Sequence, residues 1–435
     1  MQALQLIISL SILVLVHELG HFTFAKLFGT RVDKFYLFFN PWFSIYKKKI
    51  GETEYGIGWL PLGGYCKIAG MVDESMDKEQ LKQPPQPYEY RSKKLWQRFL
   101  IISGGVIFNF IFALMIYAGM LYVWGESYLP LKNMEYGIYV DSTAQSLGLH
   151  SGDRILSIDG VEPERLDDVR IALLFDEART LRVNHNGKEI EIAVPKEFNR
   201  QLINNSDDGM FISYFMPEII DSLIPQSPAE RAGLHKGDRV VAIDTVETPG
   251  TFNNFVKIVN SYAGKTINLI VERNGFRDTV SITISPEGTI GAYMQNLEDI
   301  YTFETCNFTL LQSIPEGARM GGKKLVFYVK QMKFVFTKEG LPKMGSLISM
   351  ANLYPTAWNW FAFWNLMALF SIILAFMNIL PIPALDGGHL LFLIYEFFTG
   401  KQPSDNFLMK AQMVGMAIVL SIFFFALFMD IERLF

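Results

Sequence analysis

Two histidines and a glutamate lie in the segment HELGH at residues 17–21, where their types and spacing could hold a metal ion and activate water. On a helix, His17 and His21 would lie on the same face, one turn and about 6 Å apart along the axis. This spacing suits two ligands of a tetrahedral Zn²⁺ ion, and Glu18 between them could act as a base toward water. Because a five-residue pattern also occurs by chance, its surroundings have to decide what it means.

The residues around this segment are apolar from residue 3 to residue 26. That is enough to cross a membrane, which takes about 20 such residues. Ionisable side chains at membrane depth are costly and usually functional. The alternative is that the three side chains snorkel or pair for structural reasons, but the apolar setting favours a metal site.

A catalytic zinc site needs a third protein ligand, and Asp386 is the candidate. It is the one acid in or bordering the long apolar stretch 344–385. Two prolines precede it and two glycines follow it in NILPIPALDGGHL, so the helix is interrupted there. Irregular backbone at membrane depth is tolerated where protein buries it or where it lines a water-filled cavity. His389 is a competing ligand, which we interpret as structural or as a neighbour of the ligands.

The composition indicates a membrane protein with soluble parts. Half of the 435 residues are apolar, 14% are aromatic, and the mean hydropathy is positive. The net charge of −5 gives no reason to expect nucleic acid as a partner. Cys66 and Cys306 lie far apart, which argues against a disulfide framework or a cysteine-rich zinc site. The N-terminus lacks a basic region and a cleavage site, so we interpret it as a retained membrane segment rather than a signal peptide.

Four transmembrane helices are predicted, in contact with the lipid bilayer. We expect them at residues 1–30, 98–125, 356–388 and 408–430. Lysines and arginines flank the connection 31–97 on both sides, and because positive flanks stay in the cytoplasm, this connection is predicted to be cytoplasmic. The central region and both termini would then lie on the other side of the membrane.

The central region contains an internal repeat. AQSLGLHSGDRILSIDGV (144–161) aligns without gaps to AERAGLHKGDRVVAIDTV (229–246), with ten of eighteen positions identical and a constant offset of 85 residues. A fixed period indicates duplicated domains. His150 and His235 occupy matching positions in the turn of the repeat, and we interpret them as exposed turn residues rather than ligands.

The repeated pattern resembles the PDZ domain in the arrangement common in bacterial proteases. PDZ domains bind extended peptides or chain ends by adding a strand to a sheet edge. The resemblance predicts PDZ-like domains at residues 127–200 and 207–290. The alternative, equally open, is that both are filters or spacers that hold no ligand tightly.

Residues 308–340, within a predicted segment at 301–350, interleave aromatic and basic side chains without a long uncharged run. This pattern is typical of an amphipathic helix at the membrane surface. A soluble helix packed on the second PDZ-like domain is the alternative.

Three features in order resemble the site-2 protease family over nearly the whole chain: HELGH in the first span, tandem PDZ-like repeats, and an N-x-x-P-x-P-x-L-D-G segment in a late span. The most similar branch is the bacterial regulator-of-sigma-E protease type. The resemblance implies that His17, His21 and Asp386 bind Zn²⁺ and that Glu18 is the catalytic base. Asn378 matches an asparagine that helps to hold the substrate backbone.

Two further segments match this family. YGIGWLPLGGYCKIAGM (55–71) resembles its re-entrant β-hairpin, which pairs with substrate as an added strand, so Gly63, Gly64 and Tyr65 are expected to bind substrate. SGGVIFN (103–109) matches a G-P-x-x-N element and adds Asn109 as a substrate-binding candidate. Val106 stands where the family often has proline, a departure that concerns local backbone shape rather than the chemistry.

The predicted fold class is therefore a multi-span α-helical membrane protein with four transmembrane helices, a re-entrant β-hairpin and two inserted α+β PDZ-like domains. The resemblance implies an intramembrane zinc metalloprotease of the bacterial inner membrane. Its substrates would be single-span membrane proteins, such as anti-sigma factors or signal-peptide remnants. The PDZ-like domains, periplasmic or extracellular, would limit access to an active site toward the cytoplasmic side.

Two other functional classes remain open. A membrane-anchored PDZ adaptor or chaperone would carry a vestigial metal site, yet both histidines, the glutamate and the distant aspartate are all present. A zinc transporter could also hold metal ligands within its spans. Transporters usually show symmetry among their spans, whereas here the repeat lies in the soluble region.

Overall fold

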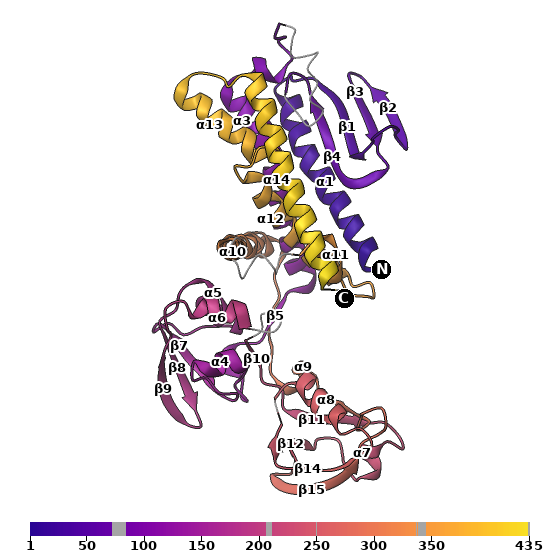
Figure 1. The fold of residues 1–435 in the computed structure, drawn as a ribbon, viewed down its shortest axis with the longest axis vertical. Coiled ribbons are helices and arrows are strands. Elements are labelled where there is room, and N and C mark those ends of the chain that lie inside the picture. The colour runs from indigo at the N-terminus through magenta and orange to yellow at the C-terminus, as the bar shows by residue number, and fades with distance from the viewer. Residues whose placement is uncertain (72–83, 206–210, 249, 336, 338–344, 434–435) are drawn as a thin grey trace. The chain divides into compact units, whose positions relative to one another are not determined.

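The computed structural model describes residues 1–71, 84–205, 211–248, 250–335, 337 and 345–433 (Figure 1). Residues 1–125 and 307–435 form one compact unit, and residues 126–306 form a second. Parts of three predicted segments lie outside the described residues. They are 72–83 of the connection 31–97, 207–210 and 249 of the second PDZ-like domain, and 336 and 338–344 of the amphipathic segment.

Four helices among the described residues are long and apolar enough to cross a membrane. They are α1 (Gln2–Leu27), α3 (Leu95–Trp124), α12 (Trp360–Ile379) and α14 (Asp405–Glu432). With the sheets described below, this architecture agrees with a membrane protein that carries sheet-rich regions.

The segment predicted as a third span, 356–388, is divided between two helices. α12 ends at Ile379, and Asp386 begins a separate helix, α13 (Asp386–Thr399). Pro381 and Pro383 lie in the break, and proline has no amide hydrogen to donate to a preceding turn. Asp386 is therefore the first residue of a new helix instead of lying near the end of a long one.

α1 and α3 cross where two glycines face each other. A methyl group added at Gly104 would lie 2.6 Å from the carbonyl oxygen of Gly20, and one added at Gly20 would clash with the Gly104 backbone. Small residues let helix backbones approach closely in membranes. The crossing brings the HELGH segment of α1 against the first half of α3.

The predicted hairpin at 55–71 is instead part of a four-stranded sheet. The strands are β1 (Val32–Phe39), β2 (Tyr46–Ile50), β3 (Thr53–Ile57) and β4 (Leu60–Ile68), in the order β2-β3-β1-β4. β1 runs parallel to β3 and antiparallel to β4. β3 and β4 therefore do not pair with each other, and β4 is an edge strand of this sheet.

Gly58 explains this arrangement. The connection from β3 to β4 crosses the end of β1, where the Gly58 amide donates to the Leu37 carbonyl at 2.8 Å. A methyl group at Gly58 would clash with the Phe39 backbone, so only glycine fits. β4 then lies along α1, since a methyl group at Gly64 would lie 2.8 Å from Cγ1 of Val14.

The predicted surface segment 301–350 contains α10 (Leu310–Val335) and α11 (Leu347–Asn352). α10 packs on α3, where a methyl group at Gly317 would lie 2.5 Å from the amide nitrogen of Ala118. The helix therefore belongs to the first unit, unlike the alternative in which it packs on the second repeat.

The second unit holds two hydrophobic cores. The first lies in the first sheet domain, defined as residues 126–214 with 297–306. Its elements are β5 (Glu126–Tyr128), β6 (Ile138–Val140), α4 (Ser142–Ser146), β7 (Arg154–Ile158), α5 (Leu166–Phe175), β8 (Thr180–His185), β9 (Lys188–Ala193), α6 (Phe198–Asn205), β10 (Ile212–Tyr214), α9 (Leu297–Ile300) and β17 (Glu304–Cys306). β7, β8 and β9 form one sheet, while β6 pairs with β10 and β5 with β17.

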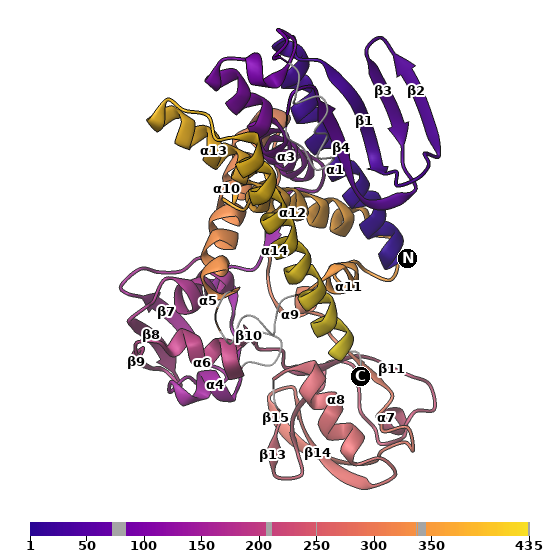
Figure 2. The same cartoon turned by 45° about the horizontal axis from the view of Figure 1, so that its top comes forward.

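The second core lies in the second sheet domain, defined as residues 218–294 (Figure 2). Its elements are β11 (Glu218–Leu223), α7 (Pro228–Arg231), β12 (Arg239–Ile243), β13 (Val246–Glu247), α8 (Phe252–Ser261), β14 (Thr266–Arg273), β15 (Phe276–Thr283) and β16 (Ala292–Met294). The strand order is β15-β14-β12-β11-β16, with β13 on β12. Because β10 pairs with β6, the first domain extends past its predicted end at residue 200.

Both copies of the repeat form the same turn. The amide of His150 donates to Asp153 Oδ2 at 2.8 Å, and the amide of His235 donates to Asp238 Oδ2 at 2.8 Å. Equal geometry at equal positions supports the duplication inferred from the sequence.

Candidate active site

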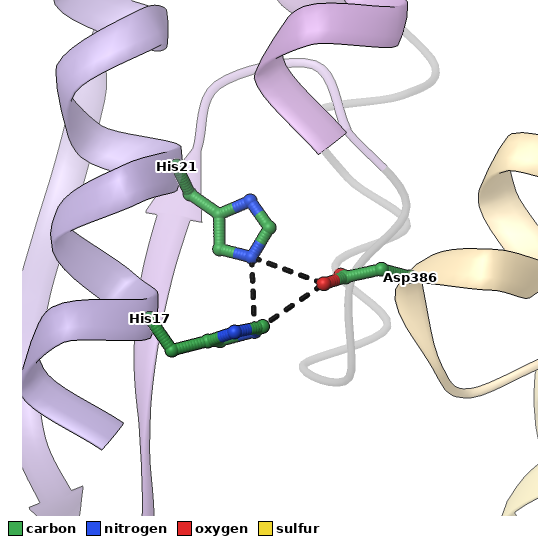
Figure 3. A group of neighbouring side chains, drawn as sticks. All are labelled: His17, His21 and Asp386. Atoms are coloured by element: carbon green, nitrogen blue, oxygen red, sulfur yellow. Dashed lines mark hydrogen bonds and ion pairs between the residues drawn. The ribbon is translucent and has the colours of Figure 1, made fainter. Parts of the chain in front are cut away.

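Three side chains from two distant segments converge at one point (Figure 3). His17 and His21 extend from the same face of α1, and Asp386 is the first residue of α13. The two Nε2 atoms are 3.2 Å apart, and Asp386 Oδ2 lies 3.3 Å from that of His17 and 3.4 Å from that of His21. The structure thus brings the predicted ligands together, and His389 is not in this group.

The hydrogen bonds fix which nitrogen of His21 faces the group. His21 Nδ1 lies 2.9 Å from the carbonyl oxygen of Ile101, which can only accept. Nδ1 therefore carries the proton, and Nε2 presents a lone pair toward His17 and Asp386. Three electron donors converge here, and such an arrangement is stable when a cation lies between them.

The dimensions fit a tetrahedral metal ion. Ligand atoms on bonds of 2.0–2.1 Å are about 3.3–3.4 Å apart around a tetrahedral Zn²⁺. The three measured separations are 3.2, 3.3 and 3.4 Å. Three protein ligands also leave a fourth position open, as catalytic zinc sites require.

Glu18 lies between this group and β4. The backbone amide of Cys66 is a hydrogen-bond partner of its carboxylate. A methyl group at Gly64 would lie 3.5 Å from Glu18 Cγ. The edge strand and the carboxylate are therefore neighbours, so an extended chain along β4 would lie close to a proton acceptor.

The predicted substrate-binding residues are placed differently from one another. Gly64 lies beside Glu18, whereas the ring of Tyr65 stacks on Tyr36 and its hydroxyl donates to Asn40 Oδ1 at 2.9 Å. Gly63 packs against the ring of Phe39. The three residues thus share a strand, but Tyr65 has contacts within the sheet that a structural residue would have.

Both predicted asparagines lie against His17. Asn378 Nδ2 is 3.5 Å from its Nε2, on the side where the ligand atoms converge. The side-chain amide of Asn109 lies 3.3 Å from its Nδ1, on the opposite side. A metal-binding His17 has its proton on Nδ1 and needs an acceptor there. The amide oxygen of Asn109 is buried without another partner in the described chain, so a turned amide would supply that acceptor.

Two contacts of the site were not predicted from the sequence, although Gly105 was matched there to the glycine of the G-P-x-x-N element. A methyl group at Gly105 would lie 2.5 Å from His21 Nε2 and would clash with His17, so α3 can approach the imidazoles only with glycine there. The second feature is a buried ion pair between α3 and α13, in which Arg98 Nη1 donates to Glu396 Oε2 at 2.9 Å and Nη2 donates to Oε1 at 2.5 Å. The adjacent glycines 104 and 105 in an otherwise bulky apolar span were the available signal for the first.

The comparison with protein families decides the identity. The sequence profile of Peptidase family M50 matches residues 5–422. The chain belongs to this family. As a member of M50, the site-2 proteases, it is a zinc metalloprotease, and the group on α1 and α13 is its candidate metal centre.

Named relatives of this M50 peptidase match over almost their full lengths. A protein from Vibrio cholerae, whose name describes it as a presumed zinc metalloprotease, is 30% identical over 98% of both chains. The regulator of sigma E protease from Haemophilus influenzae is 29% identical, and that from Escherichia coli is 28% identical, each over 98% of both chains.

Proposed function

We propose that this protease hydrolyses peptide bonds within or near the membrane segments of single-span membrane proteins. The observation that carries the proposal is the convergence of His17, His21 and Asp386 from two helices of the apolar unit. Hydrolysis inside a membrane needs a water molecule and a group that activates it, and the hydrocarbon region offers neither. Ionisable side chains gathered on such helices would hold the water and activate it.

In this proposal His17, His21 and Asp386 hold Zn²⁺. Bound zinc supplies a Lewis acid for the scissile carbonyl and lowers the pKa of water to about 7. The Glu18 carboxylate accepts the proton of the attacking water and passes it to the leaving nitrogen of the substrate. With its amide turned, Asn109 would accept the Nδ1 proton of His17 at Oδ1, as the Ile101 carbonyl accepts that of His21.

The substrate is proposed to bind as an extended strand. A helix hydrogen-bonds its own carbonyls, so a membrane segment has to unwind before it can be cut. β4 is an edge strand, and Glu18 lies beside it, which supports strand addition along residues 63–65. Asn378, near the ligand atoms, would hold the backbone of that strand.

The two sheet domains are proposed to be PDZ domains that limit access. The gapless repeat and the shared turn support this proposal. The names of the sigma-E relatives suggest anti-sigma factors as substrates, and remnants of signal peptides offer the same single span. The proposed location is the bacterial inner membrane, with the sheet domains outside and the metal centre toward the cytoplasm.

The direct test is cleavage of a single-span substrate by the wild type and by Glu18→Gln in the same membranes. Loss of a general base lowers the rate about 10²–10⁴-fold, so we expect Glu18→Gln to cleave at least about 10²-fold more slowly than the wild type. Glu52→Gln, at an exposed turn between β2 and β3, is the matched control and should cleave normally. Equal cleavage by wild type and Glu18→Gln would contradict the proposal, as would a wild type that transports zinc and cleaves nothing.

A further inference from the structure

A second group of potential metal ligands lies in the first sheet domain, outside the apolar unit. It consists of His150, Asp153 and His185, whose ligand atoms lie within 4.8 Å of one another. His150 lies in the turn that follows α4, and His185 is the last residue of β8. We propose that this corner binds a divalent transition metal such as Zn²⁺ or Cu²⁺, separately from the catalytic centre.

The contacts of His185 prepare it as a ligand. Its Nδ1 lies 2.6 Å from Asp153 Oδ1, and the buried Asp153 carboxylate can only accept when it is ionised. Nδ1 therefore carries the proton, and Nε2 presents a lone pair. Asn186 Nδ2 lies 3.3 Å from that Nε2, which is consistent with an acceptor. A histidine oriented in this way by a carboxylate is the usual form in metal sites.

The second imidazole, that of His150, lies beside the first. The ring centroids of His150 and His185 are 4.8 Å apart with an angle of 47° between the planes. The catalytic pair, His17 and His21, has the same centroid separation of 4.8 Å. Asp153 also accepts the His150 backbone amide at 2.8 Å, so one carboxylate fixes both the backbone of one histidine and the ring of the other.

The second sheet domain contains the same corner without the second imidazole. His235 and Asp238 occupy the positions of His150 and Asp153. Arg273 is the last residue of β14, as His185 is of β8, and it donates to both carboxylate oxygens of Asp238 at 2.7 Å. His185 and Arg273 each precede an Asn-Gly turn with positive φ at both residues, so their backbones are equivalent.

The chain thus contains two matching corners that differ in the residue paired with the aspartate, and in Ser151 against Lys236 within the turn. In the second domain a permanent cation neutralises the aspartate, and a metal ion would be repelled. In the first sheet domain a neutral imidazole takes that place, and a metal ion would replace Asn186 Nδ2 as the partner of its Nε2 lone pair. Two imidazoles favour Cu²⁺, Zn²⁺ or Ni²⁺ over Ca²⁺ and Mg²⁺, which prefer oxygen ligands. Bound metal would tie the turn at 150–153 to the β8–β9 hairpin.

The test is the zinc stoichiometry of the purified full-length protein after dialysis against buffered free Zn²⁺. We expect about two ions per chain for the wild type and about one for His185→Arg, which keeps the pair with Asp153 as the second domain does. His150→Ala should lose the same ion. His235→Ala, which removes the lone histidine of the second domain, is the matched control and should still bind about two.

The reverse substitution gives a gain of binding. Arg273→His should raise the stoichiometry to about three ions per chain, because it recreates the first corner in the second domain. One ion per chain in the wild type, or an unchanged second ion in both His150→Ala and His185→Arg, would overturn the proposal.

Discussion

Gly105 decides how closely α3 can approach the face of α1 that carries the proposed ligands His17 and His21. A methyl group there would lie 2.5 Å from His21 Nε2, in the space where the ligand atoms converge. We therefore expect Gly105→Ala to lower metal affinity by at least about 10–100-fold, the loss typical when a ligand is displaced from its supporting contacts. Metal content and cleavage rate of the purified variant measure this.

Gly119 provides the control for this substitution. It lies on the same helix, and a methyl group there meets nothing within 4 Å. Gly119→Ala should keep both metal and activity, and normal metal content in Gly105→Ala would show that the close approach is not required.

Glu218 makes the second sheet domain sensitive to pH. Its side chain is 2% exposed, and burial raises the pKa of its carboxyl from the usual value to about 7. The neutral form is favoured in the folded state, so this contribution to stability is complete below the unfolded pKa and is lost as pH rises to about 7. The loss amounts to about 3 kcal/mol.

Hydrogen exchange of the β12 and β14 core amides at pH 5 and pH 8 measures this effect. Protection in the wild type should fall at pH 8, after correction for the intrinsic exchange rate. Glu218→Gln should remove most of that fall, whereas Glu247→Gln, at an exposed position on β13, should not. The same fall in both variants would contradict the assignment to Glu218.

At the scale of elements, the Arg98–Glu396 pair holds α13, and with it Asp386, against α3. The two side chains are 8% and 13% exposed. Removing one partner of a buried pair costs about 3–5 kcal/mol. Arg98→Gln should therefore destabilise the first unit by that amount and lower the cleavage rate, as thermal unfolding in detergent and a substrate assay would show.

Two further variants control for this effect. The exposed pair of Arg200 with Glu197 should contribute at most about 1 kcal/mol, so Arg200→Gln should change little. Exchanging both partners, as Arg98→Glu with Glu396→Arg, should recover part of the loss. No recovery, together with normal cleavage by Arg98→Gln, would show that the pair does not position α13.

The elements could be predicted from the sequence where a single pattern in the chain was enough to identify them. Long apolar runs indicated the helices, and the constant offset of the repeat indicated duplication. The pairing of β4 with β1 could not be predicted, because it depends on a crossing at Gly58 and on a partner strand at residues 32–39. A glycine that permits a close crossing has the same sequence signal as a glycine in a loop.

The residues of the candidate site could be predicted from their chemical types, but the contacts around them could not. His17, His21 and Asp386 were paired across the chain because few ionisable side chains occur in its apolar segments. The contact of Asn109 with His17 and the role of Gly105 depend on how two helices cross, which no local pattern contains.

At the scale of the whole molecule, the second unit is an insertion whose two ends meet. β5 and β17 pair with Glu126 opposite Cys306, so the chain enters and leaves this unit at adjacent positions. A short Gly-Ser linker in place of residues 127–305 can therefore join α3 to α10 without altering the first unit.

This deletion tests the proposed role of the PDZ-like domains. The wild type should cleave a substrate with a short outer segment and spare the same substrate with a folded outer domain. The deletion variant should cleave both, measured by the fraction of each substrate cut in vesicles. Equal cleavage of the two substrates by the wild type would contradict the gating role.

The distance along the chain between the two halves of the candidate metal site has a consequence for biosynthesis. Asp386 follows His21 by 365 residues. At about 5–20 residues per second, the ribosome needs roughly 20–70 s to travel between them. During that time the nascent protein has His17 and His21 but lacks Asp386, so the proposed set of three ligands is incomplete. If Asp386 is the third ligand, the protease becomes active only after the last part of the chain has been made, and fragments released earlier should be inactive.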